Sequence, residues 1–316
     1  MTRLYFASDI HGSDKCWLKF LGAARYYEAD ILMIGGDITG KFIVPILKNA
    51  DGSASCEFLG VKRTVDTAEA LEKLKTQIAN AGQYWIEMIP EEYAYYEGNQ
   101  ARIDELFKKV VLERVERWVE IADQRLKGSG VRCLVSGAND DYFEVDDCLR
   151  KSETIEVPEG RVVDLDGFQM LSVGYGNPTP WNCPRDISEE ELGERIDRLA
   201  GSMKDMDRAI FNLHVPPYGS GLDDAPKLDK NLQVVASGSG APEMVPVGST
   251  AVRDAIVRYK PLLGLHGHIH ESRGSRRLGP TTIVNPGSEY AEGVLTGAVI
   301  DLSRENGLSK VRLVSG

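Results

Sequence analysis

All five histidines of this 316-residue chain lie in three short segments, each placed after an apolar run. Two more segments, Gly36-Asp37 and Asn139-Asp140-Asp141, also follow apolar runs and add carboxylate and amide groups. Together the five segments offer seven nitrogen and oxygen donors that could bind a metal: Asp9, His11, Asp37, Asn139, His214, His268 and His270.

The chemistry of this donor set indicates a catalytic type of metal site. Imidazole and carboxylate groups without a thiolate suit Mn, Fe or Zn better than a structural cysteine-type zinc site. Seven ligands are too many for one ion, and they fit two ions that share a bridging carboxylate. Read singly, Asp9 and Asp37 could instead be helix N-caps. The fifth histidine, His266, is expected to be a buried histidine at a strand end.

The order and context of the five segments resemble the calcineurin-like metallophosphoesterase superfamily. That family carries the motifs D-x-H, G-D, G-N-H-D/E, H and G-H-x-H in this order. The corresponding segments here are Asp9-Ile10-His11, Gly36-Asp37, Asn139-Asp140-Asp141, His214 and Gly267-His268-Ile269-His270. The resemblance extends from Leu4 to about Ile300.

The resemblance implies a dinuclear-metal-dependent phosphoester hydrolase with a metal-bridging hydroxide nucleophile. Asp37 would bridge the two ions. The first ion would also bind Asp9, His11 and His270, and the second would also bind Asn139, His214 and His268. Manganese is the preferred metal, with Fe, Zn or Ni as alternatives. The implied catalytic residues are Asp37, Asn139 and Asp140.

Asp140 departs from the family motif, which has a histidine at this position. A carboxyl group acts as an acid only when its pKa is raised, whereas two neighbouring cations lower that pKa. We therefore expect Asp140 to be ionised and the leaving group to need no proton. This expectation favours a phosphodiesterase. A phosphomonoesterase, or a metal-binding scaffold of the same fold with little turnover, remains open. Asp141 is expected to support the site through hydrogen bonds.

The overall composition restricts the partners. A net charge of −11 argues against an extensive nucleic-acid surface, although it does not exclude a phosphoester small molecule or a nucleotide. The five cysteines are scattered without a C-x-x-C pair, which is typical of a reducing compartment. There is no signal-peptide pattern and no apolar run of membrane-spanning length. The sequence therefore predicts a cytoplasmic protein without membrane contact.

Short apolar runs precede nearly every segment and predict strands that are buried on both faces. The runs are 4–7, 31–34, 131–135, 210–213 and 262–265. Ligands just past such strands lie where open α/β sheets form their binding crevices. With helices between the strands, the resemblance implies an αββα sandwich of two mixed sheets flanked by helices.

The chain is expected to form a single metallophosphoesterase domain over residues 1–316. Residues 41–99 are predicted to be an insertion with a β-hairpin, a helix and an aromatic-rich segment from Tyr84 to Tyr96. A lone hairpin is marginally stable, so the insertion must pack on the core or on a partner. It could therefore mediate a homo-oligomer.

Overall fold

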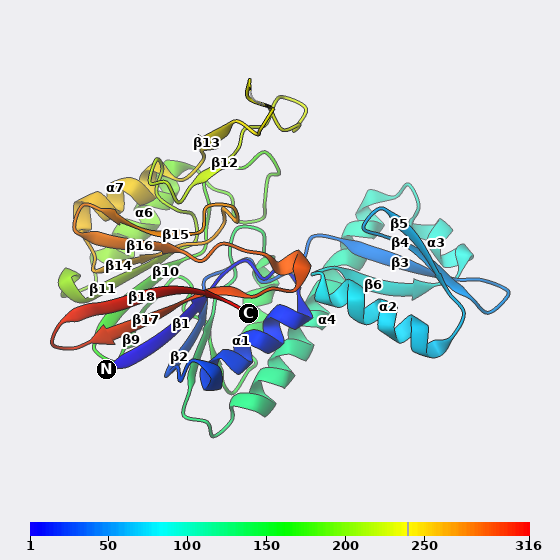
Figure 1. The fold of residues 1–316 in the computed structure, drawn as a ribbon, viewed down its shortest axis with the longest axis horizontal. Helices are drawn as coiled ribbons and strands as arrows, with labels where there is room; N and C mark the ends of the chain where they lie inside the picture. Colours follow the sequence, from blue (N-terminus) through cyan, green and yellow to red (C-terminus); the bar gives the residue numbers. More distant parts are fainter. Residues whose placement is uncertain (239) are drawn as a thin grey trace.

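Two six-stranded sheets form the centre of the computed structural model, which describes residues 1–238 and 240–316 (Figure 1). The first sheet, in spatial order, consists of β18 (Gly307–Ser315), β17 (Thr296–Ser303), β1 (Thr2–Ala7), β2 (Ile31–Ile34), β7 (Arg132–Val135) and β8 (Ile155–Glu156). The second consists of β15 (Gly274–Leu278), β16 (Thr281–Asn285), β14 (Leu263–Leu265), β11 (Ala209–Leu213), β10 (Phe168–Val173) and β9 (Val162–Leu165).

Both sheets are mixed, with parallel strands at the centre. In the first sheet β1, β2, β7 and β8 are parallel, and β17 and β18 are antiparallel neighbours. In the second sheet β10, β11, β14 and β16 are parallel, and β9 and β15 are antiparallel. Every segment with candidate ligands follows a parallel strand, so the ligands are delivered to the carboxyl ends of the strands.

Helices cover the outer face of each sheet. The first sheet is covered by α1 (Asp14–Tyr26), α4 (Gln100–Leu126) and α5 (Phe143–Leu149). The second is covered by α6 (Glu189–Ala200) and α7 (Thr250–Tyr259). Two single 3₁₀ turns occur at Met206–Arg208 and Tyr290–Glu292. The predicted αββα sandwich is therefore confirmed.

Strand β1 shows why the apolar runs are continuous. Leu4 and Phe6 point between the two sheets, into the same apolar cluster as Met170. Tyr5 and Ala7 point to the other face, into the cluster beneath helices α1 and α4. Because side chains alternate along a strand, a strand buried on both faces needs apolar residues at successive positions.

The segment between β2 and α4 forms a separate layer beside the sandwich (Figure 1). It contains a four-stranded sheet of β5 (Val61–Val65), β4 (Ala54–Phe58), β3 (Ile43–Lys48) and β6 (Tyr84–Met88), with α2 (Ala68–Asn80) and α3 (Pro90–Tyr96). This layer has its own apolar cluster. Tyr84 joins it to the sandwich, because its hydroxyl group accepts a 2.9 Å hydrogen bond from the amide of Gly40.

A second projection extends from the sheet of β11 and β14. It is a two-stranded sheet of β12 (Asp224–Pro226) and β13 (Met244–Pro246), visible at the top of Figure 1. We call this projection the arm. Among the described residues, no helix combines the length and the hydrophobicity that a membrane span requires.

Candidate metal centre

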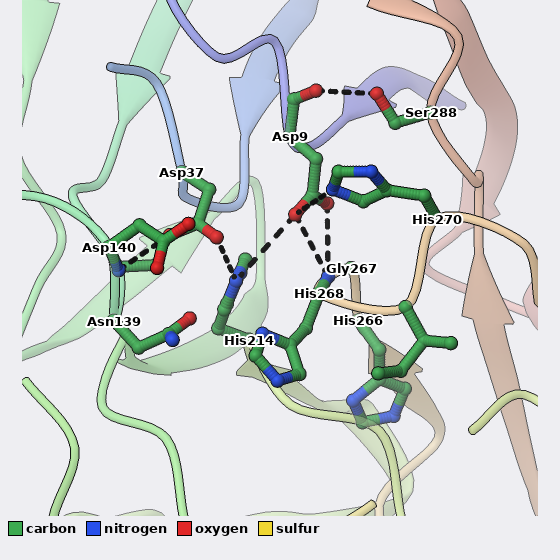
Figure 2. A network of polar contacts seen from close by, with 12 residues as sticks. Asp9, Asp37, Asn139, Asp140, His214, His266, Gly267, His268, His270 and Ser288 are labelled. Atoms are coloured by element: carbon green, nitrogen blue, oxygen red, sulfur yellow. Dashed lines mark hydrogen bonds and ion pairs between the residues drawn. The ribbon is translucent and has the colours of Figure 1, made fainter. Parts of the chain in front are cut away.

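The seven candidate ligands meet between the carboxyl ends of the two sheets, and Figure 2 labels all of them except His11. The first sheet supplies Asp9, His11, Asp37 and Asn139 from the turns after β1, β2 and β7. The second supplies His214, His268 and His270 from the turns after β11 and β14. Segments far apart in the chain thus meet at one point, as the contact between His11 and His270 illustrates.

The first group of ligand atoms belongs to Asp9, His11 and His270, which lie within 4.8 Å of one another. The Nε2 atoms of His11 and His270 are 3.0 Å apart. The Oδ1 atom of Asp9 lies 3.5 Å from His270 Nε2 and 3.9 Å from His11 Nε2. Three donor atoms aimed at one point, at these separations, can bind one cation.

The second group belongs to Asp37, His214 and His268, again within 4.8 Å of one another. The Oδ2 atom of Asp37 lies 3.2 Å from His214 Nε2 and 3.9 Å from His11 Nε2. Asp37 therefore contacts both groups. This position is the one that a bridging carboxylate would need.

The backbone at the site is held in an unfavourable conformation. Four ligands have positive φ angles: Asp9 (57°), His11 (37°), Asp37 (50°) and His268 (65°). Non-glycine residues seldom adopt such angles, and they persist where surrounding contacts enforce them. At Gly267 the packing is tighter still, because a Cβ atom there would lie 2.2 Å from Asp9 Oδ2.

Hydrogen bonds to carboxylates enforce this backbone. Both oxygens of Asp9 accept hydrogen bonds of 3.0 Å from the amide of His268, which joins the two sheets. The buried carboxylate of Asp141 accepts hydrogen bonds from the amides of Ile38, Thr39 and Ala138. Asp141 thereby joins the turn of Asp37 to that of Asn139, which is the supporting role predicted for it.

The ring of His11 is oriented by the carbonyl oxygen of Thr39, 3.2 Å from its Nδ1 atom. Because a carbonyl oxygen only accepts, Nδ1 carries the proton and Nε2 presents its lone pair to the cluster. His266 differs: it is fully buried, its Nδ1 atom lies 2.7 Å from the carbonyl oxygen of Leu213, and it belongs to neither group. It is the buried strand-end histidine that the sequence suggested.

Asp140 is placed beside the cluster and is paired with a cation. Its Oδ2 atom lies 2.5 Å from the Nζ atom of Lys41, and its Oδ1 atom accepts a hydrogen bond from Cys183 Sγ at 2.8 Å. Burial raises the pKa of Asp140, but the charges of Lys41 and His11, together with the hydrogen bonds from Cys183 and Lys41, outweigh burial and lower the pKa to about 2. The carboxylate is therefore ionised at neutral pH. Asp140 also forms a third group of ligand atoms with His11 and Asp37.

The charges of the cluster fit divalent cations. Asp9 and Asp37 are only 1% and 2% exposed, and buried carboxylates need a compensating positive charge. Burial raises the pKa of Asp37 to about 6, and the nearby carboxylates outweigh burial and raise the pKa of His214 to about 9. The buried Oδ1 atom of Asn139 has no hydrogen-bond partner in the described chain. It is thus free to bind an ion.

The cluster forms the floor of a cavity of about 600 Å³, whose lining includes Asp37, Asn139, Asp140, His268 and His270. Three residues near this cavity were missed as site residues in the sequence: Lys41, Trp181 and Cys183. Lys41 follows the Gly36-Asp37 motif by four residues, so its place in the sequence could have indicated that it lies near the site. Trp181 and Cys183 belong to a loop whose proximity to Asn139 depends on the tertiary fold. The tyrosines Tyr93 and Tyr95 lie on α3, outside the lining of this cavity.

Comparisons with known proteins agree with this fold. No protein-family model matches the chain. The uncharacterised protein MJ1162 of Methanocaldococcus jannaschii is 28% identical over 177 residues, which are 55% of this chain and 70% of that protein. The crystal structure of TT1561 of Thermus thermophilus aligns with a TM-score of 0.52 at 14% identity, covering 100% of this chain and 98% of the other.

Another crystal structure covers 99% of this chain and 98% of its own, with a TM-score of 0.58 at 16% identity. An archaeal phosphodiesterase aligns over the whole of both chains with a TM-score of 0.40 at 10% identity. At 14% and 16% identity, the likeness to the two structures with TM-scores above 0.5 concerns the fold alone. The deciding observation lies in this chain, where five motifs in the family order meet between the two sheets of an αββα sandwich.

The fold is the αββα sandwich that the resemblance to the calcineurin-like metallophosphoesterases implied. The chain departs from the motif of that family at Asp140, as the sequence indicated. It also carries the four-stranded layer after Asp37 and the arm after His214, and both lie outside the two central sheets.

Proposed function

We propose that the protein is a phosphoester hydrolase that depends on two divalent metal ions. The observation that supports this most is the arrangement of two groups of ligand atoms, both in contact with Asp37, at the floor of an open cavity. When bound, two divalent ions neutralise the charge of a phosphate group and provide a nucleophile from water near neutral pH. Asp9, His11 and His270 would hold one ion, and Asn139, His214 and His268 the other.

The protein itself supplies a further positive charge beside the candidate ligands. The Lys41 amino group is half exposed, faces the same cavity and is held by Asp140. Burial lowers the pKa of Lys41, but the carboxylates of Asp140 and Asp37 raise it further, so the amino group stays charged. We propose that Lys41 contacts the phosphate group of the substrate.

The leaving group is expected to depart without protonation. No histidine stands at position 140, and the Asp140 carboxylate carries no proton at neutral pH. A group that leaves as a stable anion, such as an aryl oxide, has no need of a proton donor. This argument favours activated phosphodiesters over alkyl monoesters.

Manganese is the metal we propose, because imidazole with carboxylate and amide oxygens suits Mn and the site has no thiolate ligand. Of the described cysteines, Cys183 comes nearest to the ligands, and its Sγ atom hydrogen-bonds to Asp140. Iron, zinc and nickel remain alternatives that elemental analysis can separate.

The test combines elemental analysis with a substrate comparison. Purified protein should lose activity on bis(p-nitrophenyl) phosphate in EDTA and regain it with Mn²⁺, and the diester should be cleaved faster than p-nitrophenyl phosphate. Turnover by the metal-free protein would contradict the proposal. If two bound metals gave no turnover on either ester, the protein would be a metal-binding scaffold.

A further inference from the structure

The cavity above the metal centre has two chemically different sides. Its floor carries the candidate ligands, whereas its walls are built from apolar side chains of two separate segments. One wall is the loop with Pro178, Pro180 and Trp181. The other wall is the arm and its base, which contribute Leu228, Val234, Val245 and Val247.

These wall residues are unusually exposed for their type. Trp181 is 65% exposed and Val234 is 54% exposed, and both belong to the lining of one cavity. Contiguous exposed apolar surface in a soluble domain commonly marks a binding site. Its continuity with the metal centre indicates a ligand whose polar end lies at the metals and whose apolar end lies between the walls.

The Trp181 loop is held in place by the metal centre itself. The carboxylate of Asp186 accepts hydrogen bonds from the amides of Thr179 (2.9 Å) and Cys183 (3.0 Å), on either side of Trp181. The same carboxylate accepts a 3.3 Å hydrogen bond from Nδ2 of Asn139. One side chain therefore fixes both the loop and a candidate metal ligand, so Trp181 has a defined position relative to the metals.

The base of the arm is equally well fixed. Asp223 is fully buried, and its carboxylate accepts hydrogen bonds from the amides of Gly219, Ser220, Gly221 and Gly248. These bonds join the two ends of the arm. The hydroxyl group of Ser272, two residues after His270, also donates a 2.7 Å hydrogen bond to the carbonyl oxygen of Asp224.

The charged groups that line the cavity limit which chemical groups the apolar end of the ligand can carry. The cavity is lined by two lysines, and both are ion-paired: Lys41 with Asp140, and Lys227 with Glu243 at 2.9 Å. Glu271 adds a negative charge. With Lys41 assigned to the phosphate group at the candidate ligands, Lys227 is the one other lysine of the described lining, and its charge is offset by Glu243. The walls therefore favour an uncharged group over a second phosphate or carboxylate group.

We propose that this cavity binds a phosphoester whose organic group is uncharged and apolar, with an aromatic ring packed on Trp181. The proposal rests on the proposed function and adds to it the substrate class. Trp181 acts as a specificity-determining residue, because an indole ring gains both apolar contact area and ring stacking with such a group.

The test measures binding to the Mn²⁺-loaded protein by isothermal titration calorimetry. The probes are methylphosphonate, phenylphosphonate and 1-naphthylphosphonate, which share the phosphonate group and differ in apolar size. Affinity should rise along this series, and Trp181→Ala should weaken naphthylphosphonate binding by about 10-fold while leaving methylphosphonate within about 2-fold. Tyr26→Ala, at an exposed aromatic residue outside this cavity, is the matched control.

The outcomes separate this inference from the proposed function. Equal affinity for all three phosphonates, unchanged by Trp181→Ala, would overturn the inference and leave the phosphoester proposal standing. Failure of every phosphonate to bind the metal-loaded protein would overturn both. A flat series together with a dimer that Trp181→Ala dissociates in sedimentation would show that the walls bind a second copy instead. Trp181→Phe should retain most of the preference for 1-naphthylphosphonate over methylphosphonate. This result would show that the weaker binding of Trp181→Ala comes from the missing aromatic ring.

Discussion

The metal centre and the four-stranded layer after it are built in contrasting ways. At the centre, five of the seven candidate ligands are buried and His268 and His270 are half-buried. Four of the ligands have positive φ angles, and carboxylates such as Asp141 fix the backbone. The layer of β3 to β6 has its own small apolar cluster and exposes Tyr93 and Tyr95 to solvent. The difference suggests that the sandwich determines the metal chemistry, and that the added segments determine what reaches it.

The largest effect in this comparison is expected for a single added methyl group at the centre. In Gly267→Ala the new Cβ atom would lie 2.1 Å from Ser8 Oγ and 2.2 Å from Asp9 Oδ2, so Asp9 must move. We expect stability to fall by about 1–3 kcal/mol and metal affinity by more than about 10-fold. Thermal unfolding and metal titration measure both quantities.

The matched control for that substitution is Gly238→Ala in the arm. Apart from its chain neighbours, no atom of the described residues lies within 4 Å of a Cβ placed there, so stability and metal affinity should stay at the wild-type values. If Gly267→Ala and Gly238→Ala changed stability and metal affinity equally, the contrast between a tightly packed metal centre and a loosely packed arm would be contradicted.

A medium effect is expected at Glu159, whose carboxylate accepts a 2.7 Å hydrogen bond from the amide of Gly174. Burial raises the pKa of this carboxyl group to about 7, although Arg185 and the amide of Gly174 favour its ionised form. The folded state thus holds the proton more tightly than the unfolded state, whose pKa is near 4.5. Stability should therefore fall as pH rises from about 4.5 to 7.

Glu159→Gln removes this titration. The variant should be more stable than the wild type by about 1–2 kcal/mol at pH 8, with the gain shrinking towards pH 5. Chemical unfolding at several pH values measures it. A pH-independent difference between the two proteins would show that Glu159 does not titrate in this range.

A smaller effect is expected at Asp140, where the ion pair with Lys41 implies that no proton is donated. Asp140→Asn should bind metal normally and keep activity on aryl diesters within about 10-fold of the wild type. Loss of turnover with both metals still bound would instead require Asp140 to be a protonated acid. The change at pH 8 and pH 6 should be similar.

The smallest effect on metal binding and turnover is expected in the four-stranded layer. Replacing Tyr93, Tyr95 and Tyr96 by Ser should leave metal content and kcat on aryl diesters unchanged. We propose that substrate preference or oligomeric state changes instead, because two of these rings are exposed. Loss of both metals from a folded triple variant would show that the layer helps to build the centre.

Much of the architecture could be predicted because burial leaves a local pattern. Strands such as β1 and β2 are apolar at every position that faces either the helices or the other sheet. The ligands could be listed because each follows such a strand in a short motif.

Other features depend on tertiary contacts that leave no local pattern. Strands β12 and β13 have three residues each and contain Pro226 and Pro246, so they leave no strand pattern in the sequence. Trp181 reaches the cavity only through the hydrogen bonds of Asp186 to its loop and to Asn139. No spacing in the sequence encodes that contact.

The central claim is that Asp37 bridges two metal ions, and metal stoichiometry tests it most directly. Inductively coupled plasma mass spectrometry of the Mn²⁺-reconstituted protein should find two ions per chain in the wild type and in Asp140→Asn. Asp37→Asn, with its fold checked by circular dichroism, should retain fewer than one ion per chain. Two tightly bound ions in folded Asp37→Asn would contradict the account.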